Sequence, residues 1–196
     1  MSKAKVETAE KQKVQMDPAF LIKLTGTLLG ICVIVALLLG IVNHVTEPII
    51  TQMQKEKTDA AMAQVLKADS YNPVETKVEG VVAVYEAIAG GQKVGCVVEV
   101  APNGFGGAIK MVVGVDANGA VTGVAVTKDA ETANVGTKVT KDQSVLDRFV
   151  GMSHADGDIT VNGGANRFDG VSGATVSSKA VTAGVNTALA AAADVA

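Results

Sequence analysis

Residues 108–126 read Ala108-Ile109-Lys110-Met111-Val112-Val113-Gly114-Val115-Asp116-Ala117-Asn118-Gly119-Ala120-Val121-Thr122-Gly123-Val124-Ala125-Val126. Two valine-rich runs, Ala108–Val115 and Val121–Val126, flank the turn residues of 116–119. Branched apolar residues favour strands, and an Asn-Gly pair between two such runs is a hairpin signal. This stretch therefore predicts an antiparallel β-hairpin.

Similar patterns extend the hairpin in both directions. Val81–Ile88 and Val94–Val100 are further valine-rich runs, whereas Ser144–Val150 and the alanine-rich Val176–Ala193 have helical patterns. Consecutive strands followed by helices favour an α+β domain. We expect residues 74–196 to form this domain, with a mainly antiparallel sheet and flanking helices.

A long apolar segment lies near the N-terminus. Residues 24–46 contain no Asp, Glu, Lys or Arg, and the mean hydropathy of the whole chain is positive at +0.32. About 20 such residues cross a bilayer as a helix. A cleaved signal peptide has a shorter apolar run after a short basic segment, whereas Glu7, Glu10 and Asp17 precede this one. We therefore predict one retained transmembrane helix over 23–46.

The distribution of lysines predicts its orientation. Basic residues near a span favour the cytoplasmic side. Those before the span are Lys3, Lys5, Lys11, Lys13 and Lys23, and those soon after it are Lys55 and Lys57. We expect a cytoplasmic tail over 1–22, with the rest of the chain on the extracytoplasmic face of a bacterial cytoplasmic membrane.

Between the span and the domain, residues 47–73 are expected to form a helical stalk and linker. Apolar residues recur near a helical period at Ile50, Met53, Met62, Val65 and Leu66. Ala68–Pro73 then contains residues that end helices. Two segments, residues 1–17 and Gly151–Asn166, are expected to be flexible.

Composition excludes several functional classes. The formal net charge of −3 gives no indication of nucleic-acid binding. Cys32 lies in the predicted span and Cys96 in a predicted strand, so neither a disulfide nor a metal site is expected. His44 and His154 are isolated, and no CxxC pair for an iron–sulfur cluster occurs. The glycine-rich segments also lack the strand–GxGxxG–helix context of NAD binding.

The segment with the clearest chemistry is Asp169-Gly170-Val171-Ser172-Gly173-Ala174-Thr175-Val176-Ser177-Ser178. It places Thr175 just before the predicted C-terminal helix, where unpaired N–H groups and the helix dipole favour a phosphate. The alternative is that Thr175 merely caps that helix. A third interpretation is reversible binding of a phosphorylated metabolite at the helix start.

Two loops accompany this segment. Residues 101–109 place three glycines around Phe105, which allows close approach of a planar ligand to the backbone. Residues 128–137 follow a predicted strand and offer polar groups to the edge of a ring. Each loop alone is equally explained as an ordinary connection.

Taken in order, these motifs resemble the FMN-binding domain family. The order is Pro-x-Gly-Phe-Gly-Gly, then Glu-Thr with a glycine soon after, then Ser-Gly-Ala-Thr-x-Ser. Many family members have Glu-Thr-Pro-Gly-x-Gly, where this chain has Glu131-Thr132-Ala133-Asn134-Val135-Gly136. Asparagine tolerates the left-handed backbone that glycine would supply, so we expect the turn to survive.

The resemblance implies FMN joined to Thr175 through a phosphoester by a separate flavin transferase. Asp169, Ser172, Gly173 and Ala174 would belong to the recognised sequence, and Lys179 either lies near the phosphate or is solvated. The residues implied to contact the cofactor are Glu131, Thr132, Gly104, Phe105 and Gly106.

Membrane-anchored members of this family are subunits of ion-pumping oxidoreductases, and the chain length is closest to those of Rnf-type complexes. The resemblance therefore implies an electron-relay subunit among other membrane and peripheral subunits of a ferredoxin:NAD oxidoreductase that moves sodium or protons. A stand-alone anchored flavoprotein of extracellular electron transfer is one alternative. A cofactor-free, membrane-anchored interaction module is another.

Overall fold

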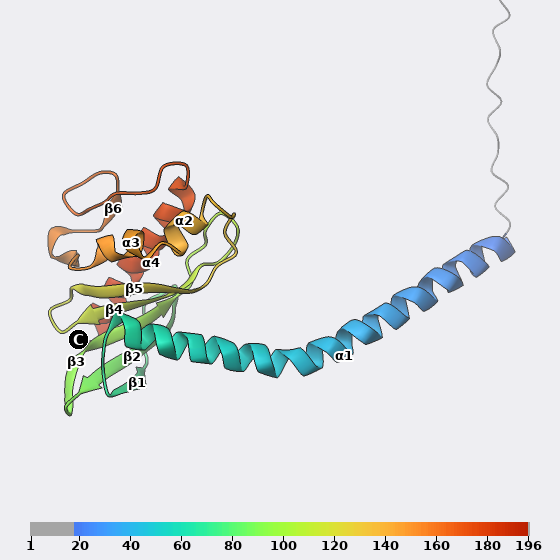
Figure 1. The fold of residues 1–196 in the computed structure, drawn as a ribbon, viewed down its shortest axis with the longest axis horizontal. Helices are drawn as coiled ribbons and strands as arrows, with labels where there is room; N and C mark the ends of the chain where they lie inside the picture. Colours follow the sequence, from blue (N-terminus) through green and yellow to red (C-terminus); the bar gives the residue numbers. More distant parts are fainter. Residues whose placement is uncertain (1–17, 196) are drawn as a thin grey trace, which may run out of the picture. The chain divides into compact units, whose positions relative to one another are not determined.

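The computed structural model describes residues 18–195 and divides the chain into two compact units, Met1–Thr51 and Gln52–Ala196. The predicted flexible segment 1–17, with most of the predicted cytoplasmic tail, lies outside the described residues. The element order is a long helix, a five-stranded sheet, several short elements and a C-terminal helix (Figure 1).

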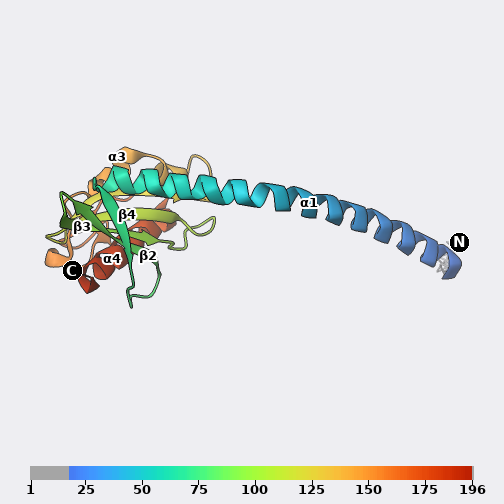
Figure 2. The same cartoon turned by 90° about the horizontal axis from the view of Figure 1, so that it is seen from below.

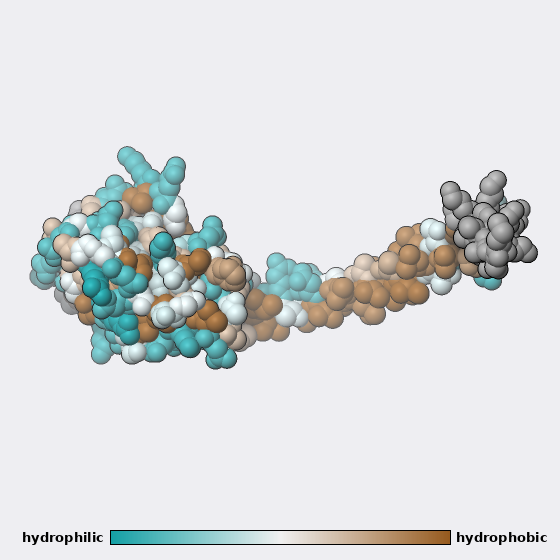
Figure 3. Space-filling model, turned by 90° about the horizontal axis from the view of Figure 1, so that it is seen from above, coloured by the Kyte–Doolittle hydropathy of each residue, from teal (hydrophilic) through white to brown (hydrophobic). Residues whose placement is uncertain are grey.

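Helix α1 extends from Pro18 to Val65 and spans 48 residues. Its apolar part has a mean hydropathy of 2.6 over an 18-residue window, none of which is buried, so α1 is a candidate membrane span. Figure 3 shows this part as a nearly continuous apolar surface. The expected span and the helical part of the expected stalk belong to one helix, and Pro48 lies inside α1 without ending it.

The sheet is an antiparallel meander of order β1-β2-β3-β4-β5. Its strands are β1 (Ser70–Val74), β2 (Val81–Ala89), β3 (Gln92–Val100), β4 (Lys110–Asp116) and β5 (Val121–Lys128). The hairpin expected between β4 and β5 is present, and Asp116 Oδ1 accepts hydrogen bonds from the backbone N–H groups of Asn118 and Ala120 over 2.8 and 2.9 Å. The α+β class with a mainly antiparallel sheet is therefore correct.

Strand β1 was not predicted. We expected only a helix break at Ala68–Pro73, but Ser70–Val74 pairs with β2. Pro73 is compatible with a strand here because β1 is an edge strand, where a missing N–H leaves no ladder bond unmade.

The sheet separates two apolar cores, because alternate residues of a strand point to opposite faces. One face, with Val98 and Val113, packs against helix α4 (Thr175–Asp194). The other, with Val97 and Val112, packs against the end of α1. Figure 2 shows α4 and the end of α1 on opposite sides of the sheet.

The end of α1 lies close to this second face. A Cβ at Gly123 would come within 3.0 Å of Val65 Cα, so glycine is needed for the helix to approach. Of the apolar positions expected on the stalk, Met62 and Val65 are buried, whereas Ile50 and Met53 are exposed.

Short elements connect β5 to α4. They are α2 (Thr137–Thr140), α3 (Gln143–Leu146), η1 (Asp147–Phe149), η2 (His154–Asp156), β6 (Thr160–Val161) and β7 (Arg167–Phe168). The helix expected over Ser144–Val150 is thus divided into α3 and a 3-10 turn. Gly151–Asn166, which we expected to be flexible, contains η2 and β6, and the Asn166 amide donates to the carbonyls of Ser153 and Gly157.

Candidate functional site

Thr175 is the first residue of α4, and its side chain is exposed. The N-cap is Ala174, and α4 has no side-chain cap. The alternative in which Thr175 caps the helix is therefore wrong: its hydroxyl accepts no capping bond and is free for other chemistry. The first-turn N–H groups of α4 keep the positive potential that favours an anion.

The turn before Thr175 is fixed by backbone contacts. The N–H of Val171 donates to Ser178 Oγ over 3.1 Å, and the N–H of Ala174 donates to the Val171 carbonyl over 3.0 Å. Gly173 has a φ of +80°, a conformation that suits glycine. The turn and the first turn of α4 therefore form one unit that presents the Thr175 hydroxyl to solvent.

A buried aromatic pair anchors the chain upstream of this turn. Phe168 ends β7 and stacks on Phe149 with ring centroids 4.1 Å apart and an interplanar angle of 12°. Both rings are fully buried. Because Phe168 directly precedes Asp169, the pair anchors the chain in the core just before residues 169–178.

The glycine-rich loop is a tight reversal between β3 and β4. The N–H of Gly104 donates to the Gly107 carbonyl, and that of Ile109 donates to the Pro102 carbonyl, each over 2.8 Å. At the tip, Phe105 is 72% exposed, although it is a large apolar side chain. The loop therefore holds an aromatic ring in solvent. Exposure of this apolar surface is unfavourable in free energy, and packing inside the domain does not offset it.

The loop after β5 keeps its turn despite the sequence change. Asn134 has a φ of +62°, so asparagine adopts the left-handed conformation expected of it. The Thr132 carbonyl accepts from the N–H groups of Val135 and Thr137 over 3.2 and 3.3 Å. This turn brings Val135 and Gly136 back toward α4.

All three segments line one cavity of about 460 Å³. Its lining residues are Phe105, Glu131, Thr132, Val135, Gly136, Gly173, Ala174, Thr175, Val176 and Ser177. Residues more than 70 positions apart in the sequence thus meet around the Thr175 hydroxyl. The size is typical of a small-molecule site.

The rim of this cavity is apolar and exposed. Phe105, Val135 and Val176 are 72%, 43% and 51% exposed, and all three line it. Exposed apolar side chains that gather around a concave site indicate a binding surface. A flat apolar ring with a phosphate at one end matches this rim and the uncapped helix start.

Glu131 is the one carboxylate in the lining, and it is only 8% exposed. Its Oε1 accepts from the N–H groups of Phe105 and Gly106 over 2.8 and 3.4 Å, and its Oε2 accepts from the Ser177 hydroxyl over 2.9 Å. Both oxygens of the Glu131 carboxylate therefore accept hydrogen bonds from other groups of the protein.

Other residues named from the sequence lie outside the lining. Gly104 and Gly106 support the loop behind Phe105, and Ser172 and Lys179 are exposed near the cavity in sequence but not part of its wall. Asp169 Oδ1 accepts from Arg167 Nε over 2.6 Å, and its carbonyl accepts from Arg148. Sequence reasoning missed Val135, Gly136, Val176 and Ser177 as lining residues, although each lies within a motif that it had singled out.

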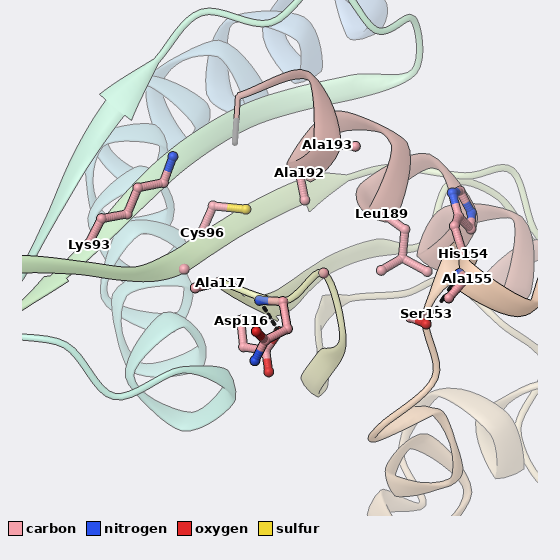
Figure 4. Close-up of a pocket in the computed structure, with 13 residues that line it drawn as sticks. Lys93, Cys96, Asp116, Ala117, Ser153, His154, Ala155, Leu189, Ala192 and Ala193 are labelled. Atoms are coloured by element: carbon pink, nitrogen blue, oxygen red, sulfur yellow. Dashed lines mark hydrogen bonds between the residues drawn. The ribbon is translucent and has the colours of Figure 1, made fainter.

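A second cavity, of about 530 Å³, lies at the other end of α4 (Figure 4). Cys96 from β3 and Leu189 and Ala192 from α4 border it, together with His154. Burial raises the pKa of the Cys96 thiol to about 11, so this group is not a reactive thiolate. None of the three motifs contributes to this cavity, and the smaller cavity around Thr175 is the candidate site.

Comparisons with known proteins identify the domain in which this site lies. The FMN-binding domain model matches residues 104–190, which contain the whole lining. The G subunit of the Na(+)-translocating ferredoxin:NAD(+) oxidoreductase complex of Acetobacterium woodii is 31% identical, covering 90% of this chain and 93% of the relative. The G subunit of the proton-translocating ferredoxin:NAD(+) oxidoreductase complex of Clostridium ljungdahlii is also 31% identical, covering 88% and 92%.

A third relative has a similar identity. The G subunit of the ion-translocating oxidoreductase complex of Methanosarcina acetivorans is 32% identical, covering 88% of this chain and 95% of the relative. Among solved structures, the C subunit of the Na(+)-translocating NADH-quinone reductase from Parabacteroides distasonis is 21% identical with a TM-score of 0.46, covering 55% of this chain and 58% of that one.

Proposed function

This chain belongs to the family of G subunits of ion-translocating oxidoreductase complexes, and we propose that it carries FMN on Thr175 and relays electrons within an Rnf-type ferredoxin:NAD oxidoreductase. Its FMN-binding domain makes it a flavoprotein electron-transfer subunit. Other subunits of such a complex are its partners. Relatives at the same 31% identity are named for sodium and for protons, so similarity in this subunit does not select the ion.

The observation that carries the proposal is the meeting of three segments around an exposed hydroxyl at an uncapped helix start. The first-turn N–H groups of α4 suit the phosphate of FMN. The apolar rim of Phe105, Val135 and Val176 suits its flat ring. The residues present therefore fit the cofactor.

FMN supplies one-electron and two-electron chemistry at its ring, while the protein provides position and electrostatics. In this chain Thr175 Oγ would hold the phosphate, and Thr132 lines the same cavity. The three apolar side chains of the rim would pack against the ring. A tether also prevents loss of the cofactor from an extracytoplasmic domain.

Attachment requires a separate enzyme. A threonine hydroxyl needs a base to attack phosphorus, and the one carboxylate in the lining already accepts three protein hydrogen bonds. A flavin transferase would join Thr175 Oγ to the FMN phosphorus of FAD, break the pyrophosphate bond and release AMP. Asp169 and Ser172 are exposed outside the cavity wall, so they are accessible to such an enzyme.

We also propose the topology. Five lysines precede the apolar segment and two follow it closely, so the N-terminus is cytoplasmic and the domain extracytoplasmic. A cysteine placed at exposed Glu79 should react with a membrane-impermeant maleimide in intact cells, and one placed at Lys13 should react only after lysis. The opposite pattern of labelling would overturn this orientation.

The flavin proposal is tested by co-producing the full chain with a flavin transferase and separating it on a denaturing gel. Flavin fluorescence should remain with the wild-type band and be absent from Thr175→Ala. Thr187→Ala is the matched control, because Thr187 also lies on α4 but is outside the cavity lining. Fluorescence that persists in Thr175→Ala, or is absent from the wild type, would contradict covalent attachment at Thr175.

A further inference from the structure

Glu131 connects the three segments of the site. Its Oε1 accepts from the Phe105 N–H in the glycine-rich loop over 2.8 Å, and its Oε2 accepts from the Ser177 hydroxyl in the first turn of α4 over 2.9 Å. Glu131 itself belongs to the loop after β5. One side chain thus joins backbone and side-chain groups 26 and 46 positions away.

Two glycines leave the space that this carboxylate occupies. A Cβ built on Gly104 would collide with Glu131 Oε1, and one built on Gly136 would collide with Glu131 Oε2. The two glycines come from different loops, and each lies against a different oxygen. The glycines at these two positions are therefore accounted for by the carboxylate rather than by close approach of a ligand.

The carboxylate has hydrogen bonds but no cation. Among residues 18–195, the ion pairs are Lys93–Glu86, His154–Asp158 and Arg167–Asp169, so no basic side chain pairs with Glu131. A buried carboxylate is costly unless hydrogen bonds satisfy it. Its bonds to the Phe105 N–H and the Ser177 hydroxyl are therefore the contacts that hold this group in place.

We propose that Glu131 is a positioning residue that holds Phe105 and the Thr175 turn of α4 at a fixed separation around the cofactor. It acts through its hydrogen bonds to Phe105 and Ser177, rather than by bonding to the flavin ring. This inference rests on the proposed function, since it concerns how the FMN site keeps its shape. It replaces the expectation that Glu131 is itself a flavin contact.

Substitution of Glu131 by glutamine removes the negative charge but keeps groups that can form both hydrogen bonds. In Glu131→Gln the amide oxygen can accept from the Phe105 N–H, and the amide nitrogen can donate to Ser177 Oγ, because a hydroxyl both donates and accepts. Alanine removes both bonds. Ser177→Ala removes only the bond to α4, and it keeps a small side chain at a buried position.

The test measures the visible circular dichroism of the attached flavin, which reports how rigidly the protein surrounds the ring. The full chain is co-produced with a flavin transferase, and flavin per chain is counted by intact mass. We expect Glu131→Ala to lose most of the signal per attached flavin, Ser177→Ala to lose part of it, and Glu131→Gln to retain it. Glu79→Ala is the control, because Glu79 is exposed and outside the site.

The outcomes separate this inference from the proposed function. A wild-type chain without attached flavin would refute the proposed function. If the wild type carries flavin, and Glu131→Ala and Ser177→Ala both show the wild-type circular dichroism per attached flavin, the positioning role alone would be overturned. A Glu131→Gln signal as low as that of Glu131→Ala would overturn it as well. If Glu131→Ala does not fold, Ser177→Ala and Glu131→Gln still decide between these results.

Discussion

The hydroxyl of Thr122, on β5, donates a 2.6 Å hydrogen bond to the carbonyl of Val65, the last residue of α1. This bond satisfies one of the carbonyls that a helix leaves unpaired at its C-terminus. It lies beside Gly123, where a Cβ would come within 3.0 Å of Val65 Cα. The end of α1 is therefore part of the folded domain, through both packing and a specific bond.

Removing this hydroxyl should destabilise the domain. We expect Thr122→Val to lower the free energy of unfolding by about 1 kcal/mol, because the Val65 carbonyl loses its partner. Thr122→Ser should restore most of the loss. Denaturant unfolding of the full chain in detergent, followed by far-ultraviolet circular dichroism, measures both variants. Equal stability of Thr122→Val and the wild type would show that the bond contributes nothing.

Much of the fold could be predicted because valine-rich runs and turn residues mark the strands locally. The hairpin of β4 and β5 needed only its own residues. Strand β1 could not be found this way, because Ser70–Val74 is polar, contains Pro73 and becomes a strand only by pairing with β2. The continuity of α1 was not predicted either, because the span was ended where charged residues resume at Glu47.

The candidate site was predictable where a motif has a local geometry. Thr175 at a helix start is such a case, and so is the left-handed Asn134. The partners of Glu131 were not predictable, because Phe105 and Ser177 approach it only in the folded domain. Val176 was expected only as part of a helical pattern, and its place in the cavity lining, where it is 51% exposed, follows from the fold.

Gly104 should tolerate no larger side chain. In Gly104→Ala the new methyl group would collide with Glu131 Oε1 and with the Ile109 side chain, which we expect to cost about 2 kcal/mol of stability. Gly163→Ala is the matched control, because nothing lies within 4 Å of a Cβ at that position. Thermal unfolding measures the stability of the two variants. A loss of stability of similar size in both would exclude a specific clash at Gly104.

Asn134 should be replaceable by glycine but not by alanine. Its φ of +62° costs an ordinary residue about 1 kcal/mol, a penalty that glycine does not have. We therefore expect Asn134→Ala to unfold more easily than the wild type and Asn134→Gly to match or exceed it. Denaturant midpoints measure the difference. Alanine and glycine variants of the same stability would be inconsistent with a strained left-handed turn.

Cys96 should be unreactive in the folded protein. Burial raises the pKa of its thiol from 9.0 to about 11, so little thiolate exists at pH 8. Iodoacetamide should therefore modify Cys96 slowly until the domain is unfolded in urea, as measured by peptide mass. Rapid modification of Cys96 in the native chain would contradict its burial.

The same shift of the Cys96 pKa makes stability depend on pH. Below pH 9 the thiol is protonated in both states and has no effect. Between pH 9 and 11 the unfolded chain loses this proton first, so the free energy of unfolding falls as pH rises, by about 2 kcal/mol at pH 11. Cys96→Ala should remove this part of the slope, and an unchanged slope would refute the assignment.

We propose that the Thr175 hydroxyl carries FMN. This attachment is tested most directly by peptide mass spectrometry of the full chain co-produced with a flavin transferase, beside Thr175→Ala. We predict that the peptide containing Thr175 gains the mass of one FMN less water, with fragment ions placing the addition on Thr175, and that the variant gains none. An unmodified Thr175 in wild-type protein, or the same addition on another residue, would contradict attachment of FMN to Thr175.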